Sequence, residues 1–195
     1  MYKLICVTSR KIFYDAFGKG ADFAGRVRKI LDAGVKVILR EKDMSESEYA
    51  DLLKQIGRRD VIAHTFTSEA AEYGCNGIHL PLPLLEKSDI NTFDTVGSSV
   101  HSREEALRAQ ELGASYITAG HVFVTDCKKG LPPRGTEFIT DVKKAVKIPV
   151  YAIGGISPDN ADKAIAAGAD GVCVMSGFMR CENVYEYVHS YNNTK

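Results

Sequence analysis

The chain has 195 residues, a length that suits one domain with a sizeable core. Lysine plus arginine and aspartate plus glutamate number 25 each, so the formal net charge is zero, which argues against nucleic-acid or membrane-surface partners held by bulk charge. The five cysteines are dispersed without a CxxC pair, which favours a reducing compartment. No apolar run approaches the length of a membrane span, so we expect a cytoplasmic protein.

Short apolar runs that suit buried strands alternate with helical patterns along the chain. The predicted strands cover residues 3–8, 35–40, 60–64, 77–80, 95–99, 116–119, 149–153 and 171–175. The predicted helices cover residues 22–33, 45–58, 68–73, 103–112, 136–146, 158–167 and 184–191. Ser102 and Glu105 have the spacing of a capping box, and Gly34, Gly113 and Gly168 stand at C-terminal stops.

Eight strands, each followed by a helix or a short turn, predict an α/β fold of the (β/α)8 TIM-barrel type, compact and forming a single domain over residues 1–195. A doubly wound open sheet is the competing architecture, but it would more naturally use five or six strands. The chain has 195 residues, about 24 for each strand–helix unit, whereas a typical barrel of this type has about 250 residues in total. We therefore expect short helices, with a vestigial one near residues 81–86.

Residues 150–177 carry the strongest functional signal. Two buried-strand patterns end in glycine, the first at Gly154 and Gly155 and the second at Ser176 and Gly177. Bare amides at adjacent strand ends, with Ser157 capping the following helix, predict an anion pocket. In eight-stranded barrels the loops after strands seven and eight commonly hold phosphate. The pattern therefore predicts a small phosphorylated ligand bound by these four residues.

Histidines gather where the barrel's chemistry is expected, at the carboxyl ends of strands. His121 follows the sixth strand and Gly120, and a neutral imidazole near pH 7 can accept and return a proton; the alternative is a structural histidine at the base of a loop. His79 and His101 favour core or capping roles, and His64 is left open. The histidines have no compact spacing such as HxxxH, so we expect no metal site.

Basic residues supply further candidates for anion binding. Arg40 and Lys42 form a pair suited to a carboxylate or phosphate, although the interleaved acids also fit a solvated charge run. Lys128 belongs to a loop that could close over an anion, and Ser99 follows the fifth strand. Cys127 is a weak candidate for a nucleophile, because no partner that would activate it is evident.

Together these motifs resemble the thiamine phosphate synthase superfamily, and most closely its thiazole tautomerase (TenI) branch. The resemblance covers nearly the whole chain. The Gly-Gly and Ser-Gly anchors are shared across the superfamily, whereas Gly-His-Val-Phe followed by Thr-Asp-Cys-Lys-Lys-Gly is more specific to the tautomerase. The anchors are Leu39-Arg40-Glu41-Lys42, Gly77-Ile78-His79-Leu80, Ser99-Val100-His101-Ser102, Gly120-His121-Val122-Phe123, Thr125 to Gly130, Ala152 to Ile156 and Val174 to Gly177.

Two departures separate the chain from the synthase pattern. A synthase has Asn-Asp at the end of strand three and an aspartate shortly after the His-Leu of strand four, and these carboxylates bind the magnesium that neutralises pyrophosphate. This chain has His64-Thr65 at the first place and no acid in residues 81–85. It also has His121 where the synthase has proline.

The resemblance therefore implies a cofactor-independent isomerase of thiamine biosynthesis, which aromatises a carboxythiazole phosphate. His121 would be its acid and base, Ser99, Arg40, Lys42 and Lys128 would contact the substrate, and the glycine-lined loops would hold the phosphate. A thiamine phosphate synthase and a non-catalytic protein that binds thiazole or thiamine phosphates are the alternatives. The sequence leaves a homo-oligomer open.

Overall fold

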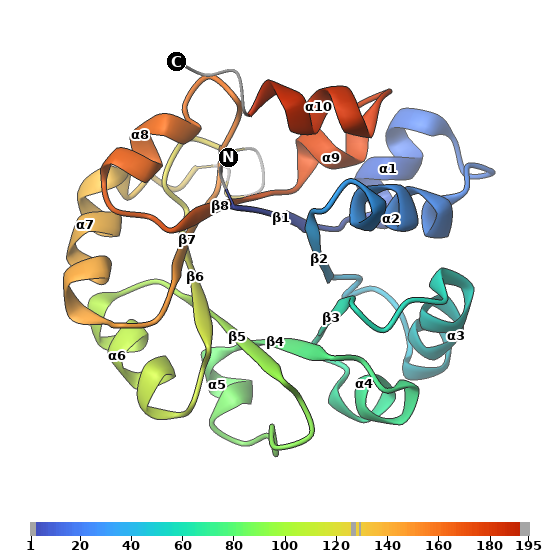
Figure 1. The fold of residues 1–195 in the computed structure, drawn as a ribbon, viewed down its shortest axis with the longest axis horizontal. Coiled ribbons are helices and arrows are strands. Elements are labelled where there is room, and N and C mark those ends of the chain that lie inside the picture. Colours follow the sequence, from blue (N-terminus) through green and yellow to red (C-terminus); the bar gives the residue numbers. More distant parts are fainter. Residues whose placement is uncertain (1–2, 126–127, 129, 192–195) are drawn as a thin grey trace.

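The computed structural model describes residues 3–125, 128 and 130–191. Eight parallel strands close into a barrel in chain order, from β1 to β8, and helices surround it (Figure 1). The predicted (β/α)8 barrel is confirmed. The strands are β1 Lys3–Val7, β2 Lys36–Leu39, β3 Ile62–His64, β4 Gly77–Pro81, β5 Thr95–Val100, β6 Tyr116–Gly120, β7 Val150–Ile153 and β8 Gly171–Val174.

The helices in the described part are short, as the chain length predicts. They are α1 Arg10–Phe17, α2 Phe23–Asp32, α3 Glu46–Ile56, α4 Thr67–Tyr73, α5 Leu82–Leu85, α6 Arg103–Glu111, α7 Gly135–Ala145, α8 Ala161–Ala166, α9 Ser176–Arg180 and α10 Val184–Ser190. The vestigial helix is confirmed as α5, and the three glycine stops follow α2, α6 and α8.

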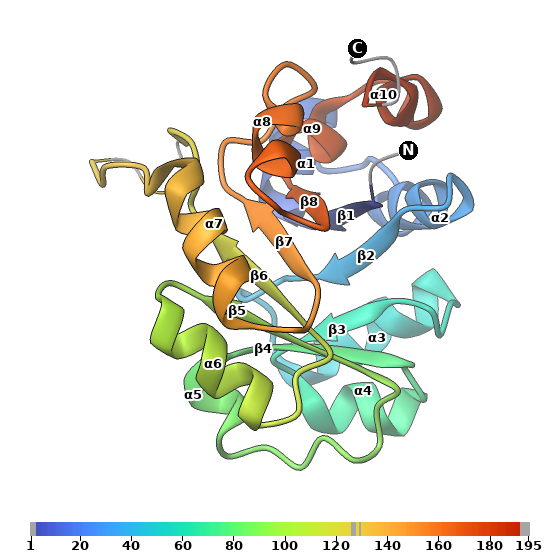
Figure 2. The same cartoon turned by 60° about the vertical axis from the view of Figure 1, so that its left-hand side comes forward.

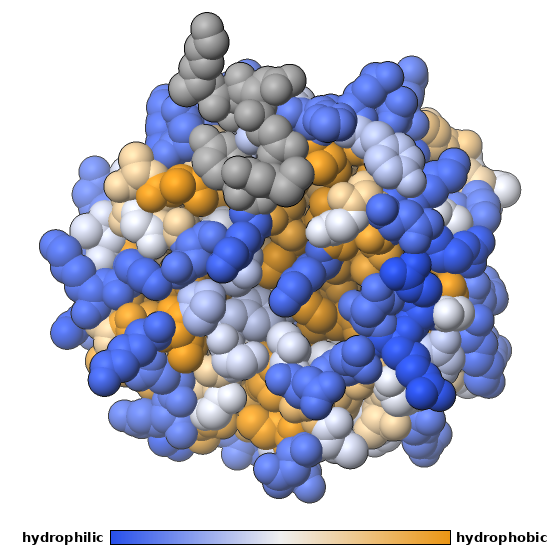
Figure 3. All heavy atoms as spheres, viewed as in Figure 1, coloured by the Kyte–Doolittle hydropathy of each residue, from blue (hydrophilic) through white to orange (hydrophobic). Residues whose placement is uncertain are grey.

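The two-residue period of the strands divides the core into two layers. In β1, Leu4 and Cys6 belong to the large cluster between the barrel and its helices, whereas Ile5 and Val7 point into the barrel. The barrel interior also contains Ile38, Ile62, Tyr116, Tyr151 and Cys173. Hydrophilic side chains surround the face seen in Figure 3, with apolar side chains between them. No helix within the described residues is long and apolar enough to span a membrane.

Two local features differ from the prediction. Helix α1 was not predicted, although Ser9 caps it by accepting a hydrogen bond from the amide of Ile12 at 3.4 Å. Ser157 does not cap α8, which begins at Ala161 after Asn160. The Asn160 side chain instead accepts from the Ser157 amide at 2.9 Å and donates to the Gly155 carbonyl at 2.9 Å, so it ties the β7 loop into a turn.

The α6 capping box forms only in part. The Ser102 hydroxyl accepts from the Glu105 amide at 3.1 Å, but the Glu105 carboxylate accepts from the His101 amide at 2.6 Å rather than from that of Ser102. His101 is exposed, and its ring Nδ1 lies 3.0 Å from the Gly120 carbonyl. These contacts agree with a structural role for His101 at the start of α6.

Candidate active site

The loop after β6 packs directly on the loop after β7 (Figure 2). The amide of Val122 donates to the Ile153 carbonyl at 3.0 Å, and that of Phe123 donates to the Gly154 carbonyl at 2.9 Å. Gly154 and Gly155 have φ of +99° and +68°, and a Cβ on either would overlap the neighbouring loop. These glycines are therefore required by the close approach of the two loops as well as by their backbone conformation.

His121 lies against Gly154, because a Cβ built on that glycine would be 2.7 Å from the His121 Cα. The histidine is half-buried, and its Nε2 lies 3.4 Å from the Leu131 carbonyl, a long distance for a hydrogen bond. Within the described residues its Nδ1 has no partner. The histidine that sequence reasoning singled out is thus held beside the glycine-lined loop with one ring nitrogen open.

Free backbone amides stand at the end of β7. Among the described residues, neither Gly154 nor Gly155 donates its amide to a hydrogen bond. Strand β8 pairs with β7, and α9 begins at Ser176, one residue after β8 ends, so the first amides of that helix lie near the adjacent strand end. Gly177 is required by packing, since a Cβ at this position would overlap the Tyr187 phenol.

Lys42 lies close enough to Arg40 and to Lys128 for its pKa to respond to their charges. Partial burial lowers the pKa of Lys42, and the positive charges of Arg40 and Lys128 lower it further. No carboxylate in the described part of the chain forms an ion pair with any of the three. Three uncompensated cations from two different loops make this end of the barrel attractive to an anion.

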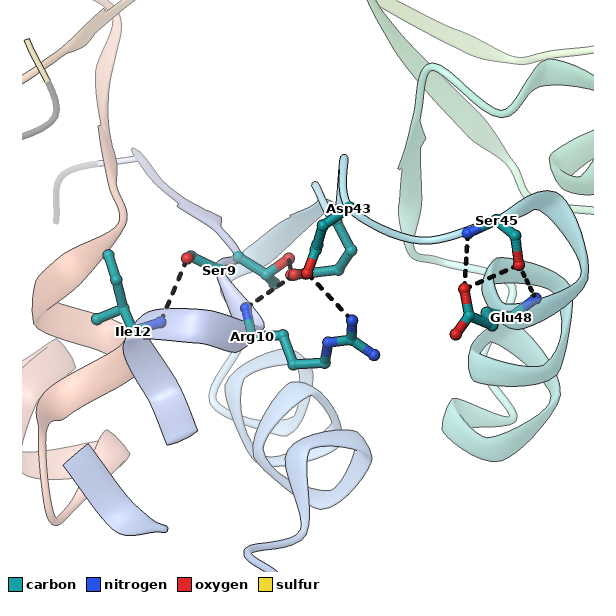
Figure 4. A network of polar contacts seen from close by, with 8 residues as sticks. Ser9, Arg10, Ile12, Asp43, Ser45 and Glu48 are labelled. Atoms are coloured by element: carbon teal, nitrogen blue, oxygen red, sulfur yellow. Dashed lines mark hydrogen bonds and ion pairs between the residues drawn. The ribbon is translucent and has the colours of Figure 1, made fainter. Parts of the chain in front are cut away.

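Glu41 corrects the interpretation of residues 40–43 as a solvated charge run. It is only 3% exposed; its carboxylate accepts from the Thr8 hydroxyl at 2.6 Å and from the Arg10 amide at 2.8 Å. Burial raises the pKa of Glu41, while these two donors oppose the rise. Arg10 also forms an ion pair with Asp43 at 3.2 Å (Figure 4). The buried acid ties the β1 loop to the β2 loop and so leaves Arg40 and Lys42 without a partner.

Two histidines are buried side by side inside the barrel. The rings of His64 and His79 are stacked with their centroids 5.8 Å apart, and burial lowers the pKa of each to about 3. The positive charges of Arg40 and Lys42 also depress the pKa of His64. Both rings are therefore neutral at pH 7, and His64 lies near the cation cluster.

A buried hydrogen-bonded chain crosses β4, β5 and β6, and sequence reasoning missed it. His79 Nδ1 lies 3.0 Å from the Tyr116 hydroxyl, and His79 Nε2 lies 2.8 Å from the Ser99 hydroxyl. The Thr118 hydroxyl donates to that of Ser99 at 3.3 Å. Polar residues at inward-facing strand positions were the available signal, but their pairing depends on the strand register.

Six of the predicted site residues fall into two groups. His121, Gly154 and Gly155 come together in one place, and Arg40, Lys42 and Lys128 in another. Ser99 is held by the buried chain and is half-buried. Cys127, together with Asp126 and Lys129, lies outside the described residues.

The residues at the ends of β3 and β4 do not fit a magnesium ion. They are His64 and Thr65, whose side chains lie 2.6 Å apart, and Pro81 followed by Leu82. Magnesium prefers carboxylate and other oxygen ligands in octahedral geometry. Within the described part of the chain no group of three or more histidine, cysteine, aspartate or glutamate residues could hold a metal ion.

A closed barrel of eight parallel strands, with a glycine pair after β7, places the chain in the class of (β/α)8-barrel proteins, in which the loops after strands seven and eight commonly bind phosphate. Within that class the chain belongs to the family described as thiamine monophosphate synthase, whose family model matches residues 4–178. The predicted superfamily is therefore confirmed.

Curated relatives carry the same name. A thiamine-phosphate synthase of Clostridium acetobutylicum is 32% identical over 194 residues, which cover 94% of this chain and 90% of the relative. Another, from Pyrococcus abyssi, is 35% identical over 168 residues, which cover 81% of each chain. Both names support an enzyme of thiamine biosynthesis, and they favour the synthase alternative over the predicted tautomerase.

Solved structures agree with the family. A thiamine phosphate pyrophosphorylase from Pyrococcus furiosus superposes with a TM-score of 0.77 at 28% identity, covering 98% of this chain and 94% of that one. A geranylgeranylglyceryl phosphate synthase from Thermoplasma acidophilum, at 16% identity and a TM-score of 0.61, covers 96% of this chain and 90% of its own and shares the fold alone.

Proposed function

We propose that this member of the family is a thiazole tautomerase that aromatises a carboxythiazole phosphate without metal or cofactor. The observation that carries the proposal is the position of His121, whose backbone packs on Gly154 and whose Nδ1 is open among the described residues. An acid/base group beside free backbone amides is the arrangement that a proton transfer on a phosphorylated substrate requires.

Each part of the site has a task in this reaction. The amides of Gly154 and Gly155, with those at Ser176 and Gly177, bind the phosphate. Arg40, Lys42 and Lys128 attract the substrate carboxylate. His121 removes a proton from the ring and returns it to the exocyclic carbon, and positioned acid/base catalysis of this kind contributes about 10²–10⁴-fold in rate.

The ends of β3 and β4 also favour isomerisation over synthesis. A synthase must stabilise a departing pyrophosphate, for which magnesium held by carboxylates is suited. His64, Thr65 and Pro81 offer no carboxylate there, and His64 lies within the field of Arg40 and Lys42. A proton transfer within a single substrate makes no such demand.

The test is to mix the protein with the non-aromatic carboxythiazole phosphate without metal and follow aromatisation by ultraviolet absorbance. We expect turnover by the wild type and a loss of about 10²–10⁴-fold in His121→Ala. His189→Ala is the matched control, because that histidine is exposed on α10. A folded His121→Ala protein with full turnover would remove His121 from the mechanism.

The alternative is a thiamine phosphate synthase, which the names of the relatives favour. Magnesium-dependent release of pyrophosphate from a pyrimidine pyrophosphate and thiazole phosphate would establish it. Ligand-dependent melting without either reaction would instead indicate a non-catalytic binding protein.

A further inference from the structure

Three neighbouring strands bring a tyrosine, a histidine and a serine into one hydrogen-bonded chain inside the barrel. His79 on β4 is in register with Gly97 on β5, and Gly97 is in register with Tyr116 on β6. Ser99 lies two residues beyond Gly97 on the same face of β5, nearer the carboxyl end of the barrel. This hydrogen-bonded chain therefore runs from the barrel interior toward the end where the candidate site lies.

Gly97 makes the contact between the tyrosine and the histidine geometrically feasible. A Cβ on this glycine would overlap both the Tyr116 hydroxyl and the His79 Nδ1. Any other residue at this position would occupy the space in which these two atoms meet at 3.0 Å. The absent side chain thus has a specific consequence, which is a hydrogen bond that passes over β5.

The buried hydroxyl of Tyr116 determines which nitrogen of His79 carries the proton. Tyr116 is 5% exposed, and within the described residues its hydroxyl has no acceptor other than His79 Nδ1. Burial raises its pKa well above 10, so the phenol remains a donor. A buried donor without an acceptor is costly, so Tyr116 donates to Nδ1, and the proton of the neutral ring is on Nε2.

The same reasoning fixes the direction of the Ser99 hydroxyl. The Nε2–H of His79 then donates to Ser99 Oγ at 2.8 Å, and the Thr118 hydroxyl donates to the same oxygen at 3.3 Å. A hydroxyl oxygen has two lone pairs and one proton. Both lone pairs are occupied, so the proton of Ser99 is directed away from His79 and Thr118, and among the described residues it has no acceptor.

We propose that Tyr116 and His79 are positioning residues that hold the Ser99 hydroxyl as a dedicated hydrogen-bond donor toward a bound ligand. Its partner is an oxygen or nitrogen acceptor of the carboxythiazole, on which electron density gathers while the proton is in transit. This role rests on the proposed function, since it assigns Ser99 to the same substrate. The hydrogen-bond polarity within the barrel does not depend on that function.

The tautomer of His79 can be measured directly by nitrogen NMR on histidine-labelled wild-type protein. We expect the Nε2–H form with Nδ1 unprotonated, and no titration of the ring between pH 5 and 9, since the pKa of His79 is lowered to about 3. The Nδ1–H form would overturn the proposal whether or not the protein is a tautomerase.

Kinetics test the link between the phenol and the serine. Ser99→Ala should lower kcat/KM by about tenfold or more, and Tyr116→Phe should do nearly the same. Without the phenol, His79 can adopt the Nδ1–H form, in which Nε2 accepts a hydrogen bond from the Ser99 hydroxyl and diverts it from the ligand. The double variant should be no worse than either single variant. Effects that multiply would show a merely structural tyrosine and overturn the proposal.

Tyr151→Phe is the matched control. This tyrosine is also buried in the barrel and packs edge-on against Tyr116, but its hydroxyl has no hydrogen bond within the described part of the chain. We expect its kcat/KM to stay within about twofold of wild type. If the wild type does not aromatise the substrate, calorimetry with thiazole phosphate replaces kinetics. Equal, non-additive losses of affinity in Ser99→Ala and Tyr116→Phe would then support the positioning of Ser99 by Tyr116 and His79, although the proposed function fails.

Discussion

Replacing Gly154 with alanine tests the idea that the β7 loop holds His121 in place. The new Cβ would lie 2.7 Å from the His121 Cα, where ordinary contact begins at 3.4 Å, and the His121 Cβ would be closer still. Relief of this overlap requires a shift of His121 by about 1 Å, and a misplacement of that size can lower a rate by about 10²-fold.

The same substitution has a stability cost with two parts. Alanine at φ +99° is strained by about 1–2 kcal/mol, and the overlap adds about 1–3 kcal/mol. Gly168→Ala separates these parts: its φ is +104°, but its Cβ would meet only the flexible Lys143 side chain at 3.4 Å. Urea denaturation should therefore show a larger loss in Gly154→Ala than in Gly168→Ala.

The decisive assay is aromatisation measured under conditions in which both glycine variants are folded. We expect turnover to fall about 10²-fold in Gly154→Ala and to stay near wild type in Gly168→Ala. Equal turnover in the two variants would refute the reasoning that contact with Gly154 positions His121.

Three further predictions concern the loops after β1 and β2. Arg40→Gln and Lys42→Gln should each raise KM for the carboxythiazole phosphate by about tenfold, with a smaller change in kcat, in steady-state kinetics. Each substitution removes a positive charge that has no carboxylate partner among the described residues and is therefore available to the substrate. Thr8→Val should lower the free energy of unfolding by about 2–4 kcal/mol in urea, because Thr8 donates to the Glu41 carboxylate and accepts from the Arg40 amide. Because burial raises the pKa of Glu41, the native state binds more protons than the unfolded state, so the free energy of unfolding should fall as pH rises from about 4.5 through the raised pKa; Glu41→Gln should remove this slope in a pH series of denaturation curves.

Much of the fold could be predicted because its signals are local. Buried-strand runs and helix stops repeat along the chain, and they identified the eight strands and the closed barrel. Helix α1 was missed because the predicted helix at residues 22–33 already completed the first strand–helix unit, and α1 is an additional helix between β1 and α2. Ser157 was misread as a cap because the side chain that organises the turn belongs to Asn160.

The sequence by itself also determined which residues stand at the strand ends, among them His121 and the glycine pair after β7. Only the tertiary structure decided which of them meet. Glu41 resembles its charged neighbours in sequence, yet it is buried, and its carboxylate accepts from Thr8 and the Arg10 amide, which belong to the segment after β1. The link between Tyr116 and Ser99 through His79 likewise depends on the register of three strands, and a register is set by the closure of the whole barrel rather than by any one segment.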